Sequence, residues 1–524
     1  MYRELFTELA ALDNEAKREK TEDDHPIRSR FQRDRDRILY SRAFRRLNGK
    51  TQVFLAAKDD HVRNRLTHTL EVNQIAQTIS KELGLNLELT EAIALGHDLG
   101  HTPFGHVGER TLNHIMNGCY KIADFNDSIN ENNKGFKHNL QGVRVAKDLE
   151  QSKMNLTKEV LWWILHHSKL EYKECKKENG VLCDLKHNNT TCVNKPLYHY
   201  NLGFYDEYIK DLDSSKFWTI EGLIVSMADE IAQRHHDIED AIEFNILSIE
   251  VLVDELEKRF KDVFRDEDRN LIGELKKLKD EKNKAIGVFS KLIVDFLTTK
   301  LIENTRFELK RFKQVNNIEN SDDFYKNKSK IFDNKVIENL VSFPEQVKNA
   351  DKELQEYLRK RILNSFEAQR MDGLGQYVIR KLFEAYTYNP QQLPDKTMKT
   401  LYTNICHMIE NEEKKYEDNK YQKIKGLLEY DKYKKNKEEG DEKKKLDVGE
   451  IRNIISALHY HIYDEENESS NLYNNVLLRT ICDYIAGMSD QYSISKFENI
   501  FVPKAWKGWC AENVSASNIK CFRA

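Results

Sequence analysis

The chain has 524 residues, of which 39% are hydrophobic and 32% charged, enough to bury one large core or two to three smaller ones. Its 83 Lys and Arg nearly balance 87 Asp and Glu, so net charge gives no argument for a nucleic-acid or membrane partner. The sequence has no secretion signal and no apolar run of about eighteen residues, which predicts a cytoplasmic protein without a membrane anchor.

Helical spacing of apolar residues predicts an all-α protein, with only 7 prolines and 21 glycines to interrupt it. A short stretch at residues 51–56, TQVFLA, is the one candidate strand. The first clear helix covers residues 65–83, and Gly84 ends it. Residues 89–100, LTEAIALGHDLG, form a short apolar helix that ends in glycine. A long helix covers residues 220–244, with four side chains pointing inward: Ile224, Met227, Ala228 and Ile231.

Polar stretches between the helices predict loops. Residues 117–137 and 171–200 are expected to be loops or insertions, and residues 414–446 a solvated helix or a charged loop. The eight cysteines are scattered without a CxxC pair, so reduced and partly buried thiols are expected. A zinc site is a weaker alternative because its candidate ligands are irregularly spaced: Cys175, Cys183, Cys192 and His187.

One stretch, GHDLGHTPFGHVGE at residues 96–109, places three histidines beside two carboxylates. His97 and Asp98, at the end of a predicted helix, can both reach one ion. His68 and Asp229, on two other predicted helices, are candidates to complete its shell. Each of these residues alone has an ordinary structural explanation, but their order and helical context together predict a metal site. Two imidazoles and two carboxylates suit Mn²⁺, Mg²⁺, Fe²⁺ or Ni²⁺ better than a structural zinc ion.

These segments resemble the HD-domain deoxynucleoside triphosphate triphosphohydrolases, the dGTPase-like family. The resemblance rests on the order H…HD…D and on its HDLGHTPFGH extension. Two blocks lead into this motif, SRFQRDRDRILYSRAFRRLNGKTQVF and DDHVRNRLTHTLEV. Four further blocks follow in the family order: FKHNLQGVRV, ADEIAQRHHDIEDA, VIRKLFEAYTYNPQQLP and CDYIAGMSDQYS. The resemblance implies an all-α HD-domain helical core at residues 28–245, after an N-terminal helical segment at 1–27. A helical C-terminal region at 246–524 is expected to complete the site and make subunit contacts.

The resemblance implies cleavage of a dNTP to a deoxynucleoside and tripolyphosphate, with a divalent ion bound by four residues: His68, His97, Asp98 and Asp229. This reaction needs a polarised phosphoryl oxygen, positive charge along the triphosphate and a proton for the departing 5′-oxygen. His101, His106 and His138 match the non-ligand histidines of the family. Glu109, one helical turn after His106, can orient that imidazole. Whether His106 gives or takes the proton is open at this point.

The TPFG segment at residues 102–105 predicts a turn that returns His106 to the ion. The resemblance assigns substrate contacts to three residues, Arg65 at the phosphates, Gln52 near the sugar and Asp237 at the 3′-hydroxyl. Gln233 departs from the pattern, because relatives usually carry a tyrosine against the sugar. The sequence therefore leaves the rejection of ribonucleotides open.

The resemblance also implies control of dNTP pools, with phage defence as one role, and a homo-oligomer, either a hexamer or a tetramer. A basic N-terminal cluster could serve subunit contacts, an effector nucleotide or single-stranded DNA. It consists of Arg33, Arg35, Arg37, Arg42, Arg45 and Arg46. The alternatives are an HD-domain nuclease or nucleoside monophosphate phosphatase, and a non-catalytic nucleotide sensor or DNA-binding scaffold. The monophosphate phosphatases have no need of the extra histidines, and the presence of all four ligand candidates disfavours the sensor.

Overall fold

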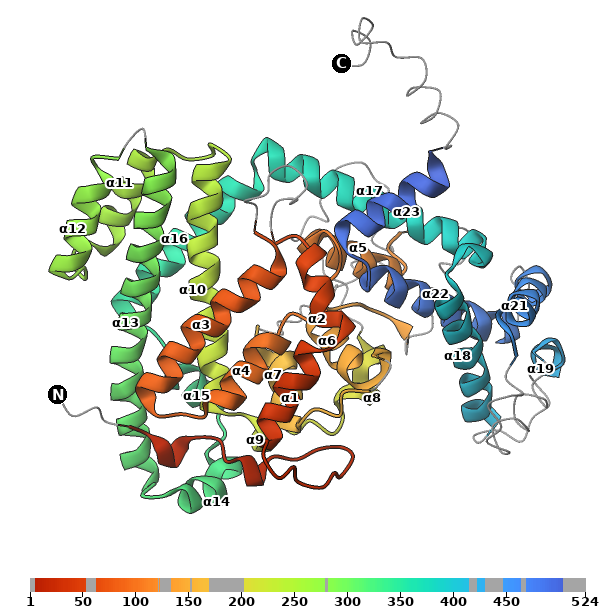
Figure 1. Cartoon of the computed structure of the whole chain (residues 1–524), viewed down its shortest axis with the longest axis horizontal. Coiled ribbons are helices and arrows are strands. Elements are labelled where there is room, and N and C mark those ends of the chain that lie inside the picture. The colour runs from red at the N-terminus through yellow and green to blue at the C-terminus, as the bar shows by residue number, and fades with distance from the viewer. Residues whose placement is uncertain are drawn as a thin grey trace, which may run out of the picture. The chain divides into compact units, whose positions relative to one another are not determined.

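The computed structural model describes residues 5–52, 63–120, 122, 133–150, 153–168, 202–278, 281–413, 422–428, 446–462 and 468–502. These fall into two compact units. The first unit comprises Met1–His101, His138–Glu171 and Tyr205–Gly373; the second comprises Thr102–Lys137, Tyr172–Phe204 and Leu374–Ala524. Helices make up both units (Figure 1). Within the described ranges the β pairing is limited to two isolated bridges, Arg18 with Thr157 and Thr51 with Asn64. The all-α class is confirmed, and residues 53–56 of the candidate strand lie outside the described residues.

The first unit contains most of the helices. They are α1 (Arg30–Leu39), α2 (Arg42–Arg46), α3 (Arg65–Leu83), α4 (Leu87–Gly96), α6 (His138–Arg144), α7 (Lys158–His166), α8 (Asp206–Ile209), α9 (Ser214–Phe217), α10 (Ile220–Glu243), α11 (Ile249–Phe260), α12 (Asp266–Leu275), α13 (Lys282–Asn316), α14 (Ser321–Ile331), α15 (Asn334–Leu340) and α16 (Glu345–Leu363). Short turns add η1 (Thr7–Leu9), η2 (Asp13–Glu15), η3 (Leu47–Gly49) and the π-helical η7 (Val145–Leu149).

Helix α10 is the central element of the first unit, because it packs against both α3 and α13 and also contacts α4 and α16 (Figure 1). Its inward face is apolar, as the sequence predicts: Ile224, Ala228 and Ile231 are fully buried, although Met227 is only half-buried. Helix α3 begins where the Asn64 side chain accepts a hydrogen bond from the Thr67 amide, and it ends at Gly84 with φ 75°. Two of the helices predicted to carry metal ligands are therefore packed directly on each other.

The second unit contains α5 (Gly105–Met116), α18 (Asp395–Glu413), α19 (Gln422–Leu427), α21 (Val448–Ile462), α22 (Glu468–Ala486) and α23 (Asp490–Phe501), with the turn η9 (Pro390–Gln392). Helix α17 (Phe366–Tyr388) belongs to it from Leu374 onward, and the turn η8 (Gly203–Tyr205) lies at a boundary between the units. Helix α22 packs against both α18 and α5. Buried aliphatic side chains form the core of the second unit, among them Ile405, Ile409, Leu458 and Ile481.

Three of the cysteines and part of the charged segment at residues 414–446 lie among the described residues. Cys119, Cys406 and Cys482 are buried, and none of them forms a disulfide with another described residue. The zinc alternative at Cys175, Cys183, Cys192 and His187 lies outside the described residues, as do residues 171–200. Within 414–446, the structure describes α19 and its flanks, where Ile424 and Leu428 are buried. Among the described residues, no helix has the length and apolarity needed to cross a bilayer.

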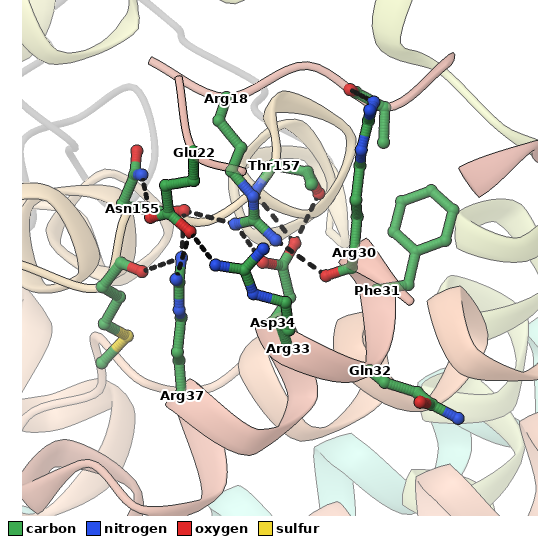
Figure 2. A network of polar contacts seen from close by, with 12 residues as sticks. Arg18, Glu22, Arg30, Phe31, Gln32, Arg33, Asp34, Arg37, Asn155 and Thr157 are labelled. Carbon is green, nitrogen blue, oxygen red and sulfur yellow. Dashed lines mark hydrogen bonds and ion pairs between the residues drawn. The ribbon is translucent and has the colours of Figure 1, made fainter. Parts of the chain in front are cut away.

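The arginines that α1 contributes to the N-terminal cluster are engaged by carboxylates of the same unit. Arg33 and Arg37 both contact Glu22, the latter at 2.5 Å (Figure 2). Arg35 pairs with Asp36 at 2.8 Å and with Glu91 at 3.2 Å. These charges are therefore neutralised locally, whereas Arg42 and Arg45 on α2 are exposed.

Beneath this surface, Asp34 is a fully buried carboxylate that ties three chain segments together (Figure 2). Its Oδ1 lies 2.5 Å from Arg18 Nη1, and its Oδ2 accepts hydrogen bonds from Thr157 N at 2.9 Å and Thr157 Oγ1 at 2.6 Å. Arg18 also donates to the carbonyl oxygen of Arg30 at 2.8 Å. Asp34 thus joins the N-terminal segment to α1 and to the start of α7.

We expect Asp34→Ala to lower the stability of the folded chain by about 3–5 kcal/mol, because it leaves Arg18 buried without its counter-charge. Asp36→Ala is the matched control on the same helix, since Asp36 is partly exposed and its loss should cost less than about 1 kcal/mol. Thermal unfolding of both variants beside the wild type measures the difference. Equal melting temperatures for the two variants would show that Asp34 is not a structural tie.

Candidate metal centre

Three elements of the first unit bring the predicted ligands together. Helix α3 carries His68, and α10 carries Asp229. The sequence placed His97 and Asp98 on a helix, but α4 ends at Gly96 and the pair lies in the turn that follows. Gly100 explains that turn: a Cβ there would lie 2.0 Å from the His138 carbonyl oxygen and 2.3 Å from Gly142 N. The chain leaves the helix so that its backbone can lie against α6.

His68, His97 and Asp98 offer ligand atoms within 4.8 Å of one another, and Asp229 adjoins this group through His68. His68 Nε2 is 3.0 Å from Asp229 Oδ1 and 4.0 Å from Asp98 Oδ2, and His97 Nε2 is 3.5 Å from Asp98 Oδ1. His68, His97 and Asp98 are buried, and the Asp229 side chain is 22% exposed. Burial alone would raise the pKa of Asp229, but the hydrogen bond and charge of His68 lower it to about 2.

The hydrogen bonding of His97 fits a metal ligand. Its Nδ1 lies 2.7 Å from the Ala94 carbonyl oxygen, which can only accept, so Nδ1 carries the proton and Nε2 the lone pair. Nε2 is buried and has no hydrogen-bond partner among the described residues. Metal-ligating histidines commonly donate from the second ring nitrogen in this way. The donor set and this lone pair therefore fit a divalent cation.

Asp98 is the most heavily contacted carboxylate of the cluster. Arg65 Nη1 lies 2.7 Å from Oδ2, and His101 Nε2 lies 2.9 Å from Oδ1. Burial would raise the pKa of Asp98, but its interactions with His101, His97 and Arg65 hold it well below its usual range. Arg65 is itself buried, and its Nε and Nη2 have no hydrogen-bond partner among the described residues. These two nitrogens remain as donors for a ligand.

Two further histidines of the first unit extend the cluster. His101 and His138 are buried and stacked, with ring centroids 3.9 Å apart. His101 is also held through its backbone, because Lys50 Nζ donates to its carbonyl oxygen. Burial lowers the pKa of His101 well below its usual range, and the nearby Arg65 adds to this.

His167 is a member of the cluster that the sequence reasoning did not single out. Its Nδ1 lies 2.8 Å from the Ile164 carbonyl oxygen, so its Nε2 holds a lone pair that faces His138 Nε2 at 3.3 Å. Burial, with His97 and His138 beside it, lowers the pKa of His167 to about 3. His138 therefore donates from Nε2 to a neutral His167. The sequence feature that could have identified His167 is the pair of adjacent histidines at the end of an apolar helix.

Asp237 and Gln52, the other predicted substrate residues, have different neighbours from the metal cluster among the described residues. Asp237 is buried on α10, where Arg234 Nη1 lies 3.6 Å from its Oδ2. Burial raises the pKa of Asp237 to about 6. The neighbouring Arg234 is held by Asp351, at 2.7 and 3.0 Å. Gln52 has a buried Oε1 without a hydrogen-bond partner among the described residues.

Comparison with known proteins gives the family. An HD domain matches residues 65–214, and a phosphohydrolase-associated domain matches residues 341–414. A deoxyguanosinetriphosphate triphosphohydrolase-like protein of Geobacter sulfurreducens is 33% identical over 392 residues, covering 74% of this chain and 83% of the relative. Proteins of the same name from Leptospira interrogans and Clostridium perfringens are each 29% identical. They cover 77% and 94% of this chain, and 91% and 92% of their own lengths.

The chain belongs to the deoxyguanosinetriphosphate triphosphohydrolase-like family. It is an HD-domain hydrolase, as the resemblance in the sequence implied. The HD match begins at Arg65 and includes three of the four candidate ligands, His68, His97 and Asp98, while Asp229 lies beyond its end.

In the second unit of this dGTPase-like protein, His106 and Glu109 both lie on α5. His106 is exposed, and Glu109 is buried with Oε1 at 3.3 Å from Lys137 Nζ. The predicted turn at residues 102–105 is present immediately before the helix. Orientation of His106 by Glu109, and return of His106 to the ion, stay predictions.

A second histidine–carboxylate group lies farther along α3 and α10. Glu71, His235 and His236 offer ligand atoms within 4.8 Å of one another. Arg63 Nε lies 3.0 Å from Glu71 Oε1, and Arg63 Nη2 lies 2.6 Å from Glu239 Oε2. Because the Arg63 guanidinium already bridges Glu71 and the neighbouring Glu239, this group is better described as an ion-pair network.

We expect Gly100→Ala to reduce metal binding, because the added Cβ must push the turn that carries His97 and Asp98 away from α6. Gly287→Ala on α13 is the matched control, since a Cβ there meets nothing within 4 Å. Metal content after dialysis against Mn²⁺, measured by atomic emission, should fall for Gly100→Ala alone. Full metal content in folded Gly100→Ala would contradict this account of the turn.

Proposed function

We propose that this protein is a metal-dependent dNTP triphosphohydrolase, which cleaves a dNTP to a deoxynucleoside and tripolyphosphate. The observation that carries the proposal is the buried His68–His97–Asp98–Asp229 cluster, with the His97 Nε2 lone pair lacking a hydrogen-bond partner among the described residues. Membership of the family supports the substrate class. The four residues would hold a divalent ion, Mn²⁺, Mg²⁺ or Fe²⁺.

The proposed reaction is attack of water on the α-phosphorus. A bond forms between the water oxygen and phosphorus, and the bond to the 5′-oxygen breaks with its electron pair, so the deoxynucleoside leaves after that oxygen gains a proton. A bound divalent ion supplies Lewis-acid polarisation of a phosphoryl oxygen and orients the water. We assign the proton transfer to His106, with Glu109 orienting its ring, and keep His101 and His138 as further candidate catalytic histidines.

The charges around the cluster support binding of a triphosphate. Arg65 would bind it through Nε and Nη2, the two buried nitrogens without hydrogen-bond partners among the described residues. Asp237 is proposed to accept the 3′-hydroxyl, and Gln52 to lie near the sugar. Since Gln233 replaces the tyrosine usual at this position, we propose weaker exclusion of ribonucleotides than in relatives with tyrosine.

Several broader roles belong to the same proposal. Hydrolysis of dNTPs would lower cytoplasmic nucleotide pools, which would also restrict phage replication. We further propose a homo-oligomer, either a hexamer or a tetramer. An effector nucleotide or single-stranded DNA would have the exposed Arg42 and Arg45 as its cationic contacts, because the arginines on α1 are already paired.

Product analysis tests the reaction. Each dNTP, alone and in mixtures, is incubated with the protein and Mn²⁺ or Mg²⁺, and the products are separated by anion-exchange chromatography. We expect equal amounts of deoxynucleoside and tripolyphosphate, with no activity in an Asp98→Ala preparation purified in parallel. Release of dNMP and pyrophosphate, or of orthophosphate from a monophosphate alone, would instead support the nuclease or phosphatase alternative.

A comparison of variants tests the division of roles. Asp98→Ala should lose both metal and turnover, because it removes one of four ligands. His106→Ala should retain the metal and lose about 10²- to 10⁴-fold in kcat, the usual contribution of general acid–base catalysis. His114→Ala, on the same helix, serves as the control with near wild-type kcat. Loss of metal from His106→Ala would make that residue a ligand, and an unchanged kcat would transfer its role to His101 or His138.

A further inference from the structure

The turn before α5 is held in a conformation that its residues do not favour. Phe104 has φ 59° and ψ 26°, a left-handed conformation that costs free energy for a residue with a side chain. Gly105 follows with φ 58°. Because Phe104 and Gly105 set the direction in which α5 begins, they also set the position of the first helical turn, which carries His106.

A residue almost 400 positions later holds this turn. Asp490, the first residue of α23, accepts a hydrogen bond from the Phe104 amide through Oδ1 at 2.8 Å. The bond is buried, with Asp490 only 3% exposed. The carboxylate lies at the N-terminus of α5, where the helix dipole favours negative charge. Asp490 therefore satisfies an amide that the strained turn would otherwise bury and stabilises the start of the helix.

Two glycines complete this support. At Gly375 on α17, a Cβ would lie 2.8 Å from the Phe104 Cβ, so only glycine lets the phenylalanine pack there. At Gly108 on α5, a Cβ would lie 2.0 Å from the Pro103 carbonyl oxygen. The turn is thus fixed by a hydrogen bond on one side and by close packing on two others, which is typical of strained backbone at functional sites.

We propose that Asp490 is a positioning residue for catalysis, acting through the Phe104 amide on the first turn of α5 and hence on His106. This inference rests on the proposed role of His106. It assigns a function to the block CDYIAGMSDQYS that is separate from metal binding, because Asp490 and the four candidate metal ligands belong to different compact units.

The test combines three substitutions with kinetics and metal content. Asp490→Ala removes the acceptor and should lower kcat by about a hundredfold, the scale of a 1 Å misplacement, with KM and bound metal unchanged. Asp490→Asn keeps an oxygen that can accept the Phe104 hydrogen bond and should restore most of the rate. Gly375→Ala, which displaces Phe104, should resemble Asp490→Ala.

The matched controls are Gly373→Ala, on the same helix as Gly375 with nothing within 4 Å of the added Cβ, and Ser493→Ala, which removes a buried hydroxyl from α23. Both should keep the wild-type kcat. Loss of metal or an increase in KM without a change in kcat would overturn the proposal, as would equal losses for Asp490→Ala and Asp490→Asn.

Hydrogen exchange separates failure of this inference from failure of the proposed function. A peptide containing residues 104–112 should exchange faster in Asp490→Ala than in the wild type, whatever reaction the protein catalyses. Unchanged exchange would show that Asp490 does not hold the turn before α5. Faster exchange with unchanged kcat would show that Asp490 holds the turn but does not position His106. If the wild-type protein released no tripolyphosphate from any dNTP while the exchange result held, the proposed function would fail, but the stabilisation of the turn by Asp490 would remain supported.

Discussion

The metal centre depends on the buried carboxylate of Asp98, because a negative charge removed from water needs a compensating group nearby. Arg65 and His101 supply it directly, at 2.7 and 2.9 Å. The same surroundings fit a divalent cation, since His68 and His97 bring imidazole nitrogens and Asp229 brings a second carboxylate. The cluster can therefore be stable on its own and still present ligands to an ion.

The close approach of particular helices and turns brings the residues of this cluster together. Helices α3 and α10 pack directly on each other, which brings His68 against Asp229. Gly100 lets the turn after α4 lie against α6, where a side chain would collide with the His138 carbonyl oxygen. Carbonyl oxygens of Ala94 and Ile164 then fix the protonated nitrogens of His97 and His167. Packing and hydrogen bonding thus determine which nitrogens face the cluster.

The sequence predicted the parts of the protein that depend on local pattern. Helical spacing and Gly84 located α3, and the long amphipathic run located α10 with Ile224 and Ile231 inward. Contacts between residues distant in the chain were beyond that reasoning. His167 was missed because its role comes from packing beside His97 and His138. The arginines of α1 gave the sequence a basic cluster, but Glu22 and Asp36 neutralise them only once the chain is folded.

We propose that one divalent ion is held by His68, His97, Asp98 and Asp229. A crystal structure of the Mn²⁺-loaded protein tests this, with anomalous scattering used to locate the metal. We expect one strong peak at about 2.0–2.3 Å from both His68 Nε2 and His97 Nε2, with Asp98 and Asp229 oxygens completing the shell and Arg65 moved away from Asp98. A peak at the Glu71–His235–His236 group, or at Asp98–His101–His138 without His68, would contradict it.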